Sequence, residues 1–261
     1  MRILCLHGKG TSAAIFKSQT STARAHLADR SIDFAFVDGP FPSAPAAGID
    51  LFYPPPYYSF AEEASLAASH ASCAWLADHL AREGPYDAVM GFSQGCYVAA
   101  SLLLLHRANR PLEPPPFKAA IFICGGAPLS LAESVGFDIP QVVWERDRAS
   151  RDALFAQADS AAILAKGSDR WAGTVGDGGP GEEEEIRRDL CGPFSIDVPT
   201  VHVYGNKDPR YSAGVQLSGL CAEDKRRVFD HRGGHEIPRT EAVSREIAGL
   251  VRWALDQTGV S

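Results

Sequence analysis

Short apolar runs alternate with segments of helical periodicity along most of this chain. Strands are predicted for the apolar runs at residues 2–6, 33–37, 88–90, 119–124, 200–204 and 227–229. Several runs are apolar at consecutive positions, as expected for strands that helices cover on both faces. Helical spacing occurs between them, over residues 16–28, 60–82 and 94–107. The pattern predicts an α/β fold with a mostly parallel sheet of about six strands flanked by helices.

The clearest helical pattern is the last one in the chain. Apolar residues recur at helical spacing over residues 243–254, and Thr240 precedes them as a candidate N-cap. This segment is predicted to be an amphipathic helix docked on the sheet.

Two segments interrupt the alternation. Residues 39–59 are rich in proline and aromatic residues, which favour an ordered loop at the carboxyl edge of the sheet over a disordered one. Residues 125–198 form a long insertion within what we predict to be a single domain, residues 1–261. Its length leads to the hypothesis that it acts as a lid. Its glycine-rich stretch at 176–181 and four glutamates at 182–185 predict a mobile, solvated excursion.

Composition narrows the classes of function. With 261 residues, 45% of them hydrophobic, the chain can bury a large core. The net charge of −7 argues against a nucleic-acid partner, which requires clustered cations. Apolar runs are too short for a membrane span, and the first residues lack the pattern of a signal peptide, so we expect a cytoplasmic protein. The six cysteines include no C-x-x-C pair, which predicts buried thiols and neither disulfides nor a metal site.

The motif that carries chemistry is Gly-Phe-Ser-Gln-Gly at residues 91–95. It follows a predicted strand and precedes a predicted helix. A sharp turn in this context exposes the serine hydroxyl, and the glycines allow strand and helix to pass closely. The pattern predicts Ser93 as a catalytic nucleophile.

A nucleophilic serine needs a base and a carboxylate that orients it, in the order serine, acid, histidine. Asp208 follows the strand at 200–204, and His235 lies between the strand near 229 and the last helix. Both positions are loops at the carboxyl edge of the sheet. Asp230 and Asp197 remain alternatives to Asp208, while His231 and His202 are less suitable bases because one follows its strand closely and the other lies inside one.

Acyl transfer also needs donors for the developing oxyanion. One is expected to be the backbone N–H of Gln94, the residue after the nucleophile. The other is expected from the glycine-rich turn after the first strand, at the N–H of Lys9.

Taken together, these motifs resemble the FSH-type serine hydrolase family, an α/β-hydrolase group of esterases and thioesterases common in fungi. The resemblance is carried by Leu-Cys-Leu-His-Gly-x-Gly, Phe-Val-Asp-Gly-Pro-Phe-Pro, the segment through Gly-Phe-Ser-Gln-Gly, Gly-Asn-Lys-Asp and Gly-Gly-His-Glu-Ile-Pro-Arg, in this order. It implies an α/β-hydrolase fold, a triad of Ser93, Asp208 and His235, and an acyl pocket shaped by an aromatic loop. Four residues are assigned to that pocket: Phe41, Tyr57, Tyr58 and Phe60.

The predicted reaction is hydrolysis of an acyl thioester or ester through an acyl-enzyme, with no metal or organic cofactor. The favoured substrate is an acyl or polyketide chain held as a thioester, with an acyl carrier protein of a polyketide synthase as a candidate partner. A small-molecule carboxylesterase is the nearest alternative. The alternative outside the enzymes is a binding protein that retains the fold but does not catalyse a reaction.

Overall fold

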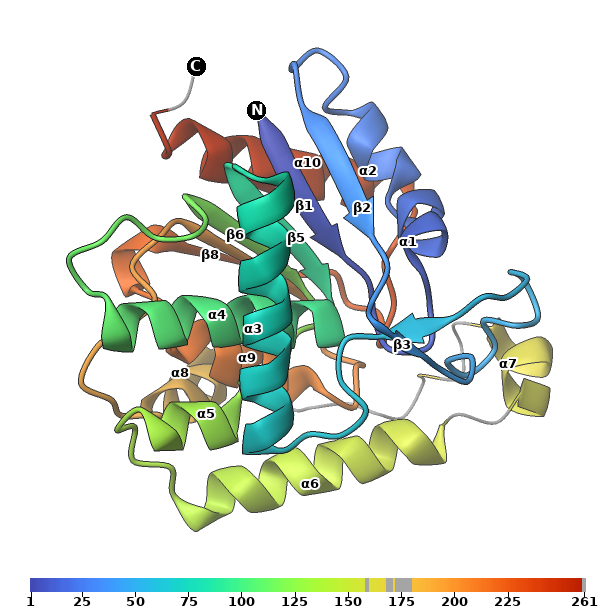
Figure 1. The fold of residues 1–261 in the computed structure, drawn as a ribbon. Coiled ribbons are helices and arrows are strands. Elements are labelled where there is room, and N and C mark those ends of the chain that lie inside the picture. Colours follow the sequence, from blue (N-terminus) through green and yellow to red (C-terminus); the bar gives the residue numbers. More distant parts are fainter. Residues whose placement is uncertain (158–159, 168–170, 172–179, 260–261) are drawn as a thin grey trace.

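A parallel sheet of six strands lies at the centre of the protein (Figure 1). The computed structural model describes residues 1–157, 160–167, 171 and 180–259. All five strand pairings in this sheet are parallel. The order of its strands is β2 (Asp33–Val37), β1 (Arg2–Leu6), β5 (Ala88–Phe92), β6 (Ala119–Ile123), β7 (Thr200–Tyr204) and β8 (Arg226–Asp230). The predicted α/β class and all six predicted strands are confirmed.

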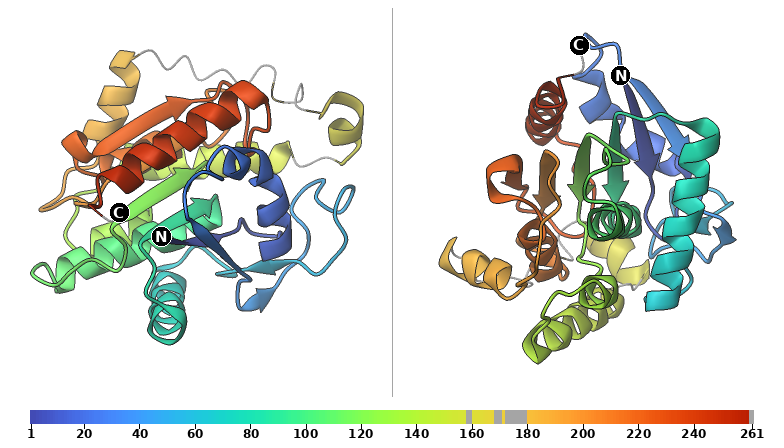
Figure 2. Two further views of the ribbon diagram at one scale, coloured as in Figure 1. Left: turned by 90° about the horizontal axis from the view of Figure 1, so that it is seen from above. Right: turned by 60° about the vertical axis from the view of Figure 1, so that its left-hand side comes forward.

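Helices cover both faces of this sheet (Figure 2). One face carries α1 (Ala13–Gln19), α2 (Ser21–Ala25) and α10 (Glu241–Asp256). The other carries α3 (Leu66–Glu83), α4 (Gln94–Asn109) and α9 (Tyr211–Gly219). Strand β5 shows how the core is divided, because Val89 packs into the cluster beneath α4 and Met90 into the cluster beneath α10. Both side chains are buried, which explains the unbroken apolar runs in the sequence.

Two predicted helices have different limits in the structure. The segment at 16–28 forms two short helices, since the chain turns at Thr20, whose hydroxyl and N–H both donate to the Phe16 carbonyl. Helix α3 begins at Leu66, where the Ser65 hydroxyl accepts the N–H of Ala68 as an N-cap. The final helix α10 begins after Thr240 as predicted, although the Thr240 side chain makes no capping hydrogen bond.

The proline-rich segment after β2 is ordered, as its aromatic residues predict. It forms a small antiparallel pair from β3 (Phe41–Pro42) and β4 (Tyr58–Ser59). The start of this proline-rich segment is tightly packed: a Cβ on Gly39 would lie 2.3 Å from the Ser59 carbonyl oxygen. The segment therefore lies against the loop that follows β1, where the Gly10 N–H donates to the Tyr58 carbonyl.

In its described residues, the insertion between β6 and β7 is largely helical. It contains α5 (Leu129–Ser134), α6 (Gln141–Ala156), α7 (Ser160–Lys166) and α8 (Pro180–Arg188). The glycines at 176, 178 and 179 lie outside the described residues. The prediction that all four glutamates are solvated is wrong for Glu183, which pairs with Arg187 and accepts the hydroxyl protons of Tyr204 and Tyr211. Helical spacing brings Arg187 onto the same face as Glu183, which sequence composition alone does not reveal.

Five of the six cysteines are buried free thiols, and Cys191 is exposed. Among the helices of the described chain, none has both the length and the apolar character required to span a bilayer.

Candidate active site

Ser93 occupies a strained turn between β5 and α4. Its backbone has φ 51° and ψ −110°, a conformation that costs energy for a residue with a side chain. The turn is possible because the flanking glycines lack side chains: a Cβ on Gly91 would lie 2.6 Å from the Cys96 nitrogen, and one on Gly95 would lie 2.1 Å from the Leu6 carbonyl oxygen. The motif Gly-Phe-Ser-Gln-Gly thus presents Ser93 at the carboxyl edge of the sheet.

Ser93 begins a chain of hydrogen bonds to two other loops. Its Oγ lies 3.0 Å from His235 Nε2, and His235 Nδ1 lies 2.8 Å from Asp208 Oδ2. The carboxylate of Asp208 is buried, with the residue only 4% exposed. A carboxylate accepts the proton on Nδ1, so Nε2 is left with the lone pair that faces the Ser93 hydroxyl. The structure therefore brings together the three residues that the sequence singled out.

The loop after β7 fixes the orientation of Asp208. Its Oδ1 accepts the N–H of Arg210 at 2.7 Å, and its own N–H donates to the Gly205 carbonyl at 2.9 Å. The alternative carboxylates have other partners. Asp230 accepts the N–H groups of Asn206 and Arg232, and Asp197 pairs with Lys225.

The alternative histidines, too, are hydrogen-bonded to other groups. His202 is buried inside β7, where its Nε2 lies 3.1 Å from Thr200 Oγ1, and burial lowers its pKa to about 3. His231 Nδ1 accepts the N–H of Gly233, and burial lowers the pKa of this imidazole. Neither ring faces the Ser93 hydroxyl, so His235 is the histidine positioned to act on it.

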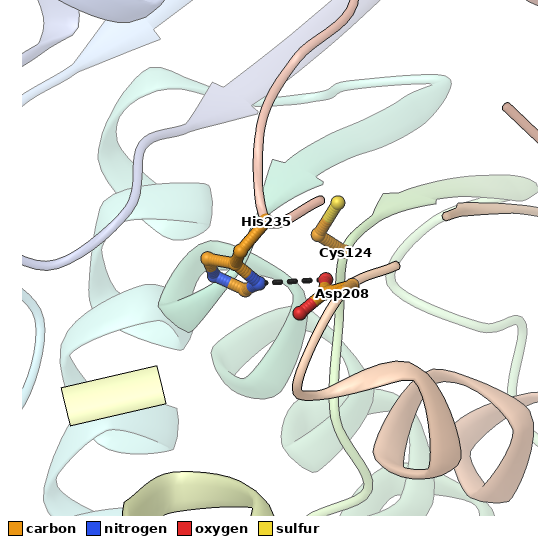
Figure 3. Close-up of side chains that lie close together, drawn as sticks. All are labelled: Cys124, Asp208 and His235. Atoms are coloured by element: carbon orange, nitrogen blue, oxygen red, sulfur yellow. Dashed lines mark hydrogen bonds and ion pairs between the residues drawn. The ribbon is translucent and has the colours of Figure 1, made fainter. Parts of the chain in front are cut away.

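Cys124 lies beside the Asp208 and His235 pair (Figure 3). Its thiol and the facing Asp208 and His235 atoms all lie within 4.8 Å of one another, a spacing that could in principle hold a metal ion. The donor chemistry fits poorly, because burial raises the pKa of the Cys124 thiol well above its ordinary value and a metal ligand must be a thiolate. His235 Nδ1 and Asp208 Oδ2 already bond each other, and Asp208 Oδ1 accepts the N–H of Arg210. These residues therefore fit a hydrogen-bonded pair of histidine and carboxylate better than a metal centre.

The loop after β1 passes next to the serine. A Cβ on Gly8 would lie 3.5 Å from Ser93 Cβ. Within the described chain, the backbone N–H groups of Lys9 and Gln94 have no protein acceptor. The Lys9 ammonium donates to the Glu62 carbonyl at 2.9 Å. The two amides named from the sequence as oxyanion donors are thus free to bind a ligand.

Two side chains that hold this region together were not identified from the sequence. His7 is fully buried, accepts the Gly39 N–H on Nε2 at 3.0 Å, and donates from Nδ1 to the Gly8 carbonyl at 2.7 Å. Burial lowers the pKa of His7, which favours this neutral form. The Gln94 side chain bonds the backbone of Phe60 and Ala61. His7 could have been noticed in the sequence as a polar residue that directly follows the apolar strand at residues 2–6.

A cleft of about 1610 Å³ opens above Ser93 and His235. Its walls come from the loops after β1, β5, β6, β7 and β8, from the segment after β2, and from the insertion. Apolar side chains form much of the lining, namely Ile49, Phe52, Phe92, Leu154, Phe155, Ile163, Trp171, Ile237 and Val243. The volume of the cleft and its apolar lining are appropriate for an acyl chain.

The four aromatic residues predicted to bind substrate do not line this cleft. Phe60 is buried against His7 and Trp75 in the core, and the Tyr57 hydroxyl donates to the Tyr53 carbonyl. Tyr58 and Phe41 belong to the β3–β4 pair. The prediction placed the right segment beside the site but selected the wrong side chains, because residues 44–50 and Phe52 line the cleft whereas Phe41 and Tyr58 lie in the β3–β4 pair.

Comparison with known proteins agrees with this geometry. Residues 1–247 match the family model described as "Serine hydrolase (FSH1)". "Esterase FPY3" of Fusarium mangiferae is 33% identical over 248 residues, which are 92% of this chain and 89% of that protein. "Esterase alnB" of Emericella nidulans is 29% identical over 98% of this chain and 97% of that protein. A solved carboxylesterase from Mesorhizobium loti aligns over 98% of this chain and 88% of its own, with 14% identity and a TM-score of 0.50, and shares the fold.

Proposed function

From the premise that this chain belongs to the FSH1 serine hydrolase family, with an α/β-hydrolase fold, we propose that Ser93, His235 and Asp208 are its catalytic triad. The observation that carries the proposal is the continuous hydrogen-bonded path from the Ser93 hydroxyl through the imidazole to a buried carboxylate. The substrate is an acyl ester or thioester bound in the adjoining cleft. No step requires a metal or an organic cofactor.

The geometry accounts for each proton transfer. His235 Nε2 removes the Ser93 proton as Oγ attacks the carbonyl carbon, and Asp208 stabilises the resulting imidazolium through Nδ1–H. His235 then protonates the departing alcohol or thiol, which leaves an acyl-enzyme on Ser93. Water, deprotonated by the same nitrogen, attacks that acyl group, and the imidazolium returns the proton to Oγ as the acid leaves.

The N–H groups of Lys9 and Gln94 are proposed to bind the oxyanion of each tetrahedral intermediate. Their lack of protein acceptors supports this role, as does the position of Gln94 at the amino-terminal end of α4, where the helix dipole favours negative charge. Preorganised donors of this kind typically contribute several kcal/mol to lowering a barrier. The His7 contacts to Gly8 and Gly39 hold the loop that contains Lys9.

For the substrate we favour an acyl chain held as a thioester, on the pantetheine arm of a carrier protein in a biosynthetic pathway. The size and apolar lining of the cleft support an extended acyl chain. A small-molecule carboxylesterase is supported equally by the relatives named esterases. Cytoplasmic location and movement of residues 125–198 as a lid stay predictions.

A matched substrate panel tests the proposed function. Oxygen esters and N-acetylcysteamine thioesters of the same acyl groups would be compared by kcat/KM across a series of chain lengths. Thioester cleavage that exceeds ester cleavage, with dependence on chain length, is the result we expect. A preference for short oxygen esters would favour the carboxylesterase alternative.

Labelling with a fluorophosphonate tests the nucleophile independently of the natural substrate. Ser93→Ala should remove labelling and lower kcat by roughly 10⁵-fold or more. Ser134→Ala is a matched control, because this hydroxyl lies on α5 and donates to the Leu131 carbonyl. Persistent labelling of the Ser93→Ala protein would refute the triad.

A further inference from the structure

Arg210 is a buried cation in the wall of the cleft. It lies two residues after Asp208 and is only 8% exposed, and it belongs to the lining of the cleft. Its Nη1 donates to Asp147 Oδ1 at 2.8 Å, to the Asp147 carbonyl at 3.0 Å and to Ser150 Oγ at 2.7 Å. One nitrogen of the guanidinium thus attaches the loop after β7 to helix α6 of the insertion.

The other edge of the same guanidinium has no protein partner. In residues 1–157, 160–167, 171 and 180–259, no acceptor contacts Nε or Nη2 of Arg210. Nη2 lies at Gly126, where a Cβ would approach it to 2.8 Å, and Gly126 also lines the cleft. A glycine at this position therefore leaves room for the guanidinium at the surface of the cleft. Unpaired donors on a buried cation are costly unless water or a ligand accepts their protons.

Charges of both signs surround Arg210, and none of the described carboxylates pairs with the free edge of its guanidinium. Among the described residues, Asp147 is the one carboxylate within ion-pair distance of Arg210, and its second oxygen accepts a hydrogen bond from Arg151 at 2.8 Å. Two guanidinium groups that both line the cleft therefore share one carboxylate. The pKa of Asp147 is lowered by Arg210 and Arg151 against the opposing effect of burial, so this carboxylate is charged at neutral pH. The exposed carboxylate of Asp152 also lines the cleft, but no ion pair joins it to either arginine.

We infer that the free edge of Arg210 is a subsite for a carboxylate on the acyl part of the substrate. Nε–H and Nη2–H lie side by side in a planar fork, and such an edge can bond both oxygens of a carboxylate in parallel. The preferred substrates are then half-esters or half-thioesters of dicarboxylic acids, whose far end pairs with Arg210 while the reacting carbonyl lies at Ser93. This inference rests on the proposed hydrolase function, because the subsite belongs to the same cleft.

Three series of 4-nitrophenyl esters test the carboxylate subsite at Arg210. The first contains half-esters of the dicarboxylic acids from adipic to dodecanedioic acid. The second contains the same compounds with the free carboxylate converted to a methyl ester, and the third contains plain alkanoates of equal length. The wild-type enzyme should prefer the free carboxylate over its methyl ester by about 10-fold or more in kcat/KM at one or more lengths. Arg210→Met should remove that preference, mainly through KM. Arg210→Lys should retain part of it, since the ammonium keeps the charge but not the fork.

A purely structural role of Arg210 predicts a different result. Loss of the α6 contact would lower kcat/KM for all three series by the same factor. Arg148→Gln is the matched control, because it removes one positive charge from the exposed face of α6 outside the cleft and should keep the wild-type preference. Gly126→Ala provides a second variant, in which the added Cβ displaces Nη2 and should reduce the preference.

The wild-type series decides the inference even if Arg210→Met fails to fold. Equal or poorer cleavage of the free carboxylates at every length would overturn the subsite while leaving the hydrolase proposal intact. Failure to hydrolyse any of the three series, together with absence of fluorophosphonate labelling, would instead refute the proposed function on which the subsite depends.

Discussion

His235 Nδ1 lies 2.8 Å from Asp208 Oδ2, although 27 residues and a complete helix and strand separate the two in the chain. The other oxygen of the carboxylate is occupied by the N–H of Arg210. Asp208 therefore presents a single oxygen to the ring, and this fixes which ring nitrogen faces Ser93. The orientation of the His235 ring therefore depends on the loop after β7.

Asp208→Asn should lower kcat by on the order of 10³- to 10⁴-fold, because an amide can donate to Nδ1 and so favours the tautomer with its proton on Nε2. Steady-state kinetics on any cleaved ester measures the effect. Asp230→Asn is the control. Its retained side-chain carbonyl can still accept the N–H groups of Asn206 and Arg232, so activity should stay close to wild type.

Gly95→Ala should destabilise the protein by about 1–3 kcal/mol or more, because the new Cβ would lie 2.1 Å from the Leu6 carbonyl oxygen. Gly249→Ala is the contrasting variant: it lies exposed within α10, nothing lies within 4 Å of its Cβ position, and helix propensity should stabilise it by about 0.5–1 kcal/mol. Urea denaturation of both proteins measures the difference. Equal stability of the two variants would contradict the close contact at the elbow.

His7→Leu should lower kcat by up to about 10²-fold with little change in KM, since the loop that contains Lys9 would lose its attachment to Gly39. His7→Asn keeps a donor toward the Gly8 carbonyl and should recover part of the loss. Kinetics with one ester at saturating and limiting concentrations separates the two constants. A change confined to KM would argue against a role in holding the oxyanion loop.

Stability should decrease in acid because of His202. Its pKa falls from 6.5 to about 3 on folding, chiefly through burial and further through Arg226 and Arg187. Between these values the unfolded chain binds a proton that the native protein does not, so stability present above pH 6.5 is lost as the pH falls.

The slope attributable to this one group approaches about 1.4 kcal/mol per pH unit. Urea denaturation of wild type and His202→Gln across this pH range tests the assignment. The variant should be less stable at neutral pH but should lose less on acidification. His7 and His231, whose pKa values are also lowered by burial, account for a remaining slope of the same sign. Parallel curves for the two proteins would show that His202 is not the group responsible.

The local sequence pattern was sufficient to predict those elements whose structure depends mainly on their own residues. Four central strands are buried on both faces, so their sequences are mostly apolar, apart from Arg2 in β1 and Thr200 and His202 in β7, and they are recognisable without tertiary information. Ser93 was recognisable because glycines at fixed spacing are required for its turn. Limits of helices were less predictable, because α3 begins where Ser65 caps it and where the Gln94 side chain holds the preceding backbone.

The sequence by itself determined the α/β fold and its strands, and it singled out Ser93, Asp208 and His235 as the predicted triad, because chain order and local spacing place each of them in a loop after a strand. Only the tertiary structure decided what forms the walls of the cleft. Contacts between distant segments turn Phe60 and Tyr57 into the core and bring Arg210 to the cleft surface. Such contacts depend on how separate elements pack together, and no local periodicity in the chain records them.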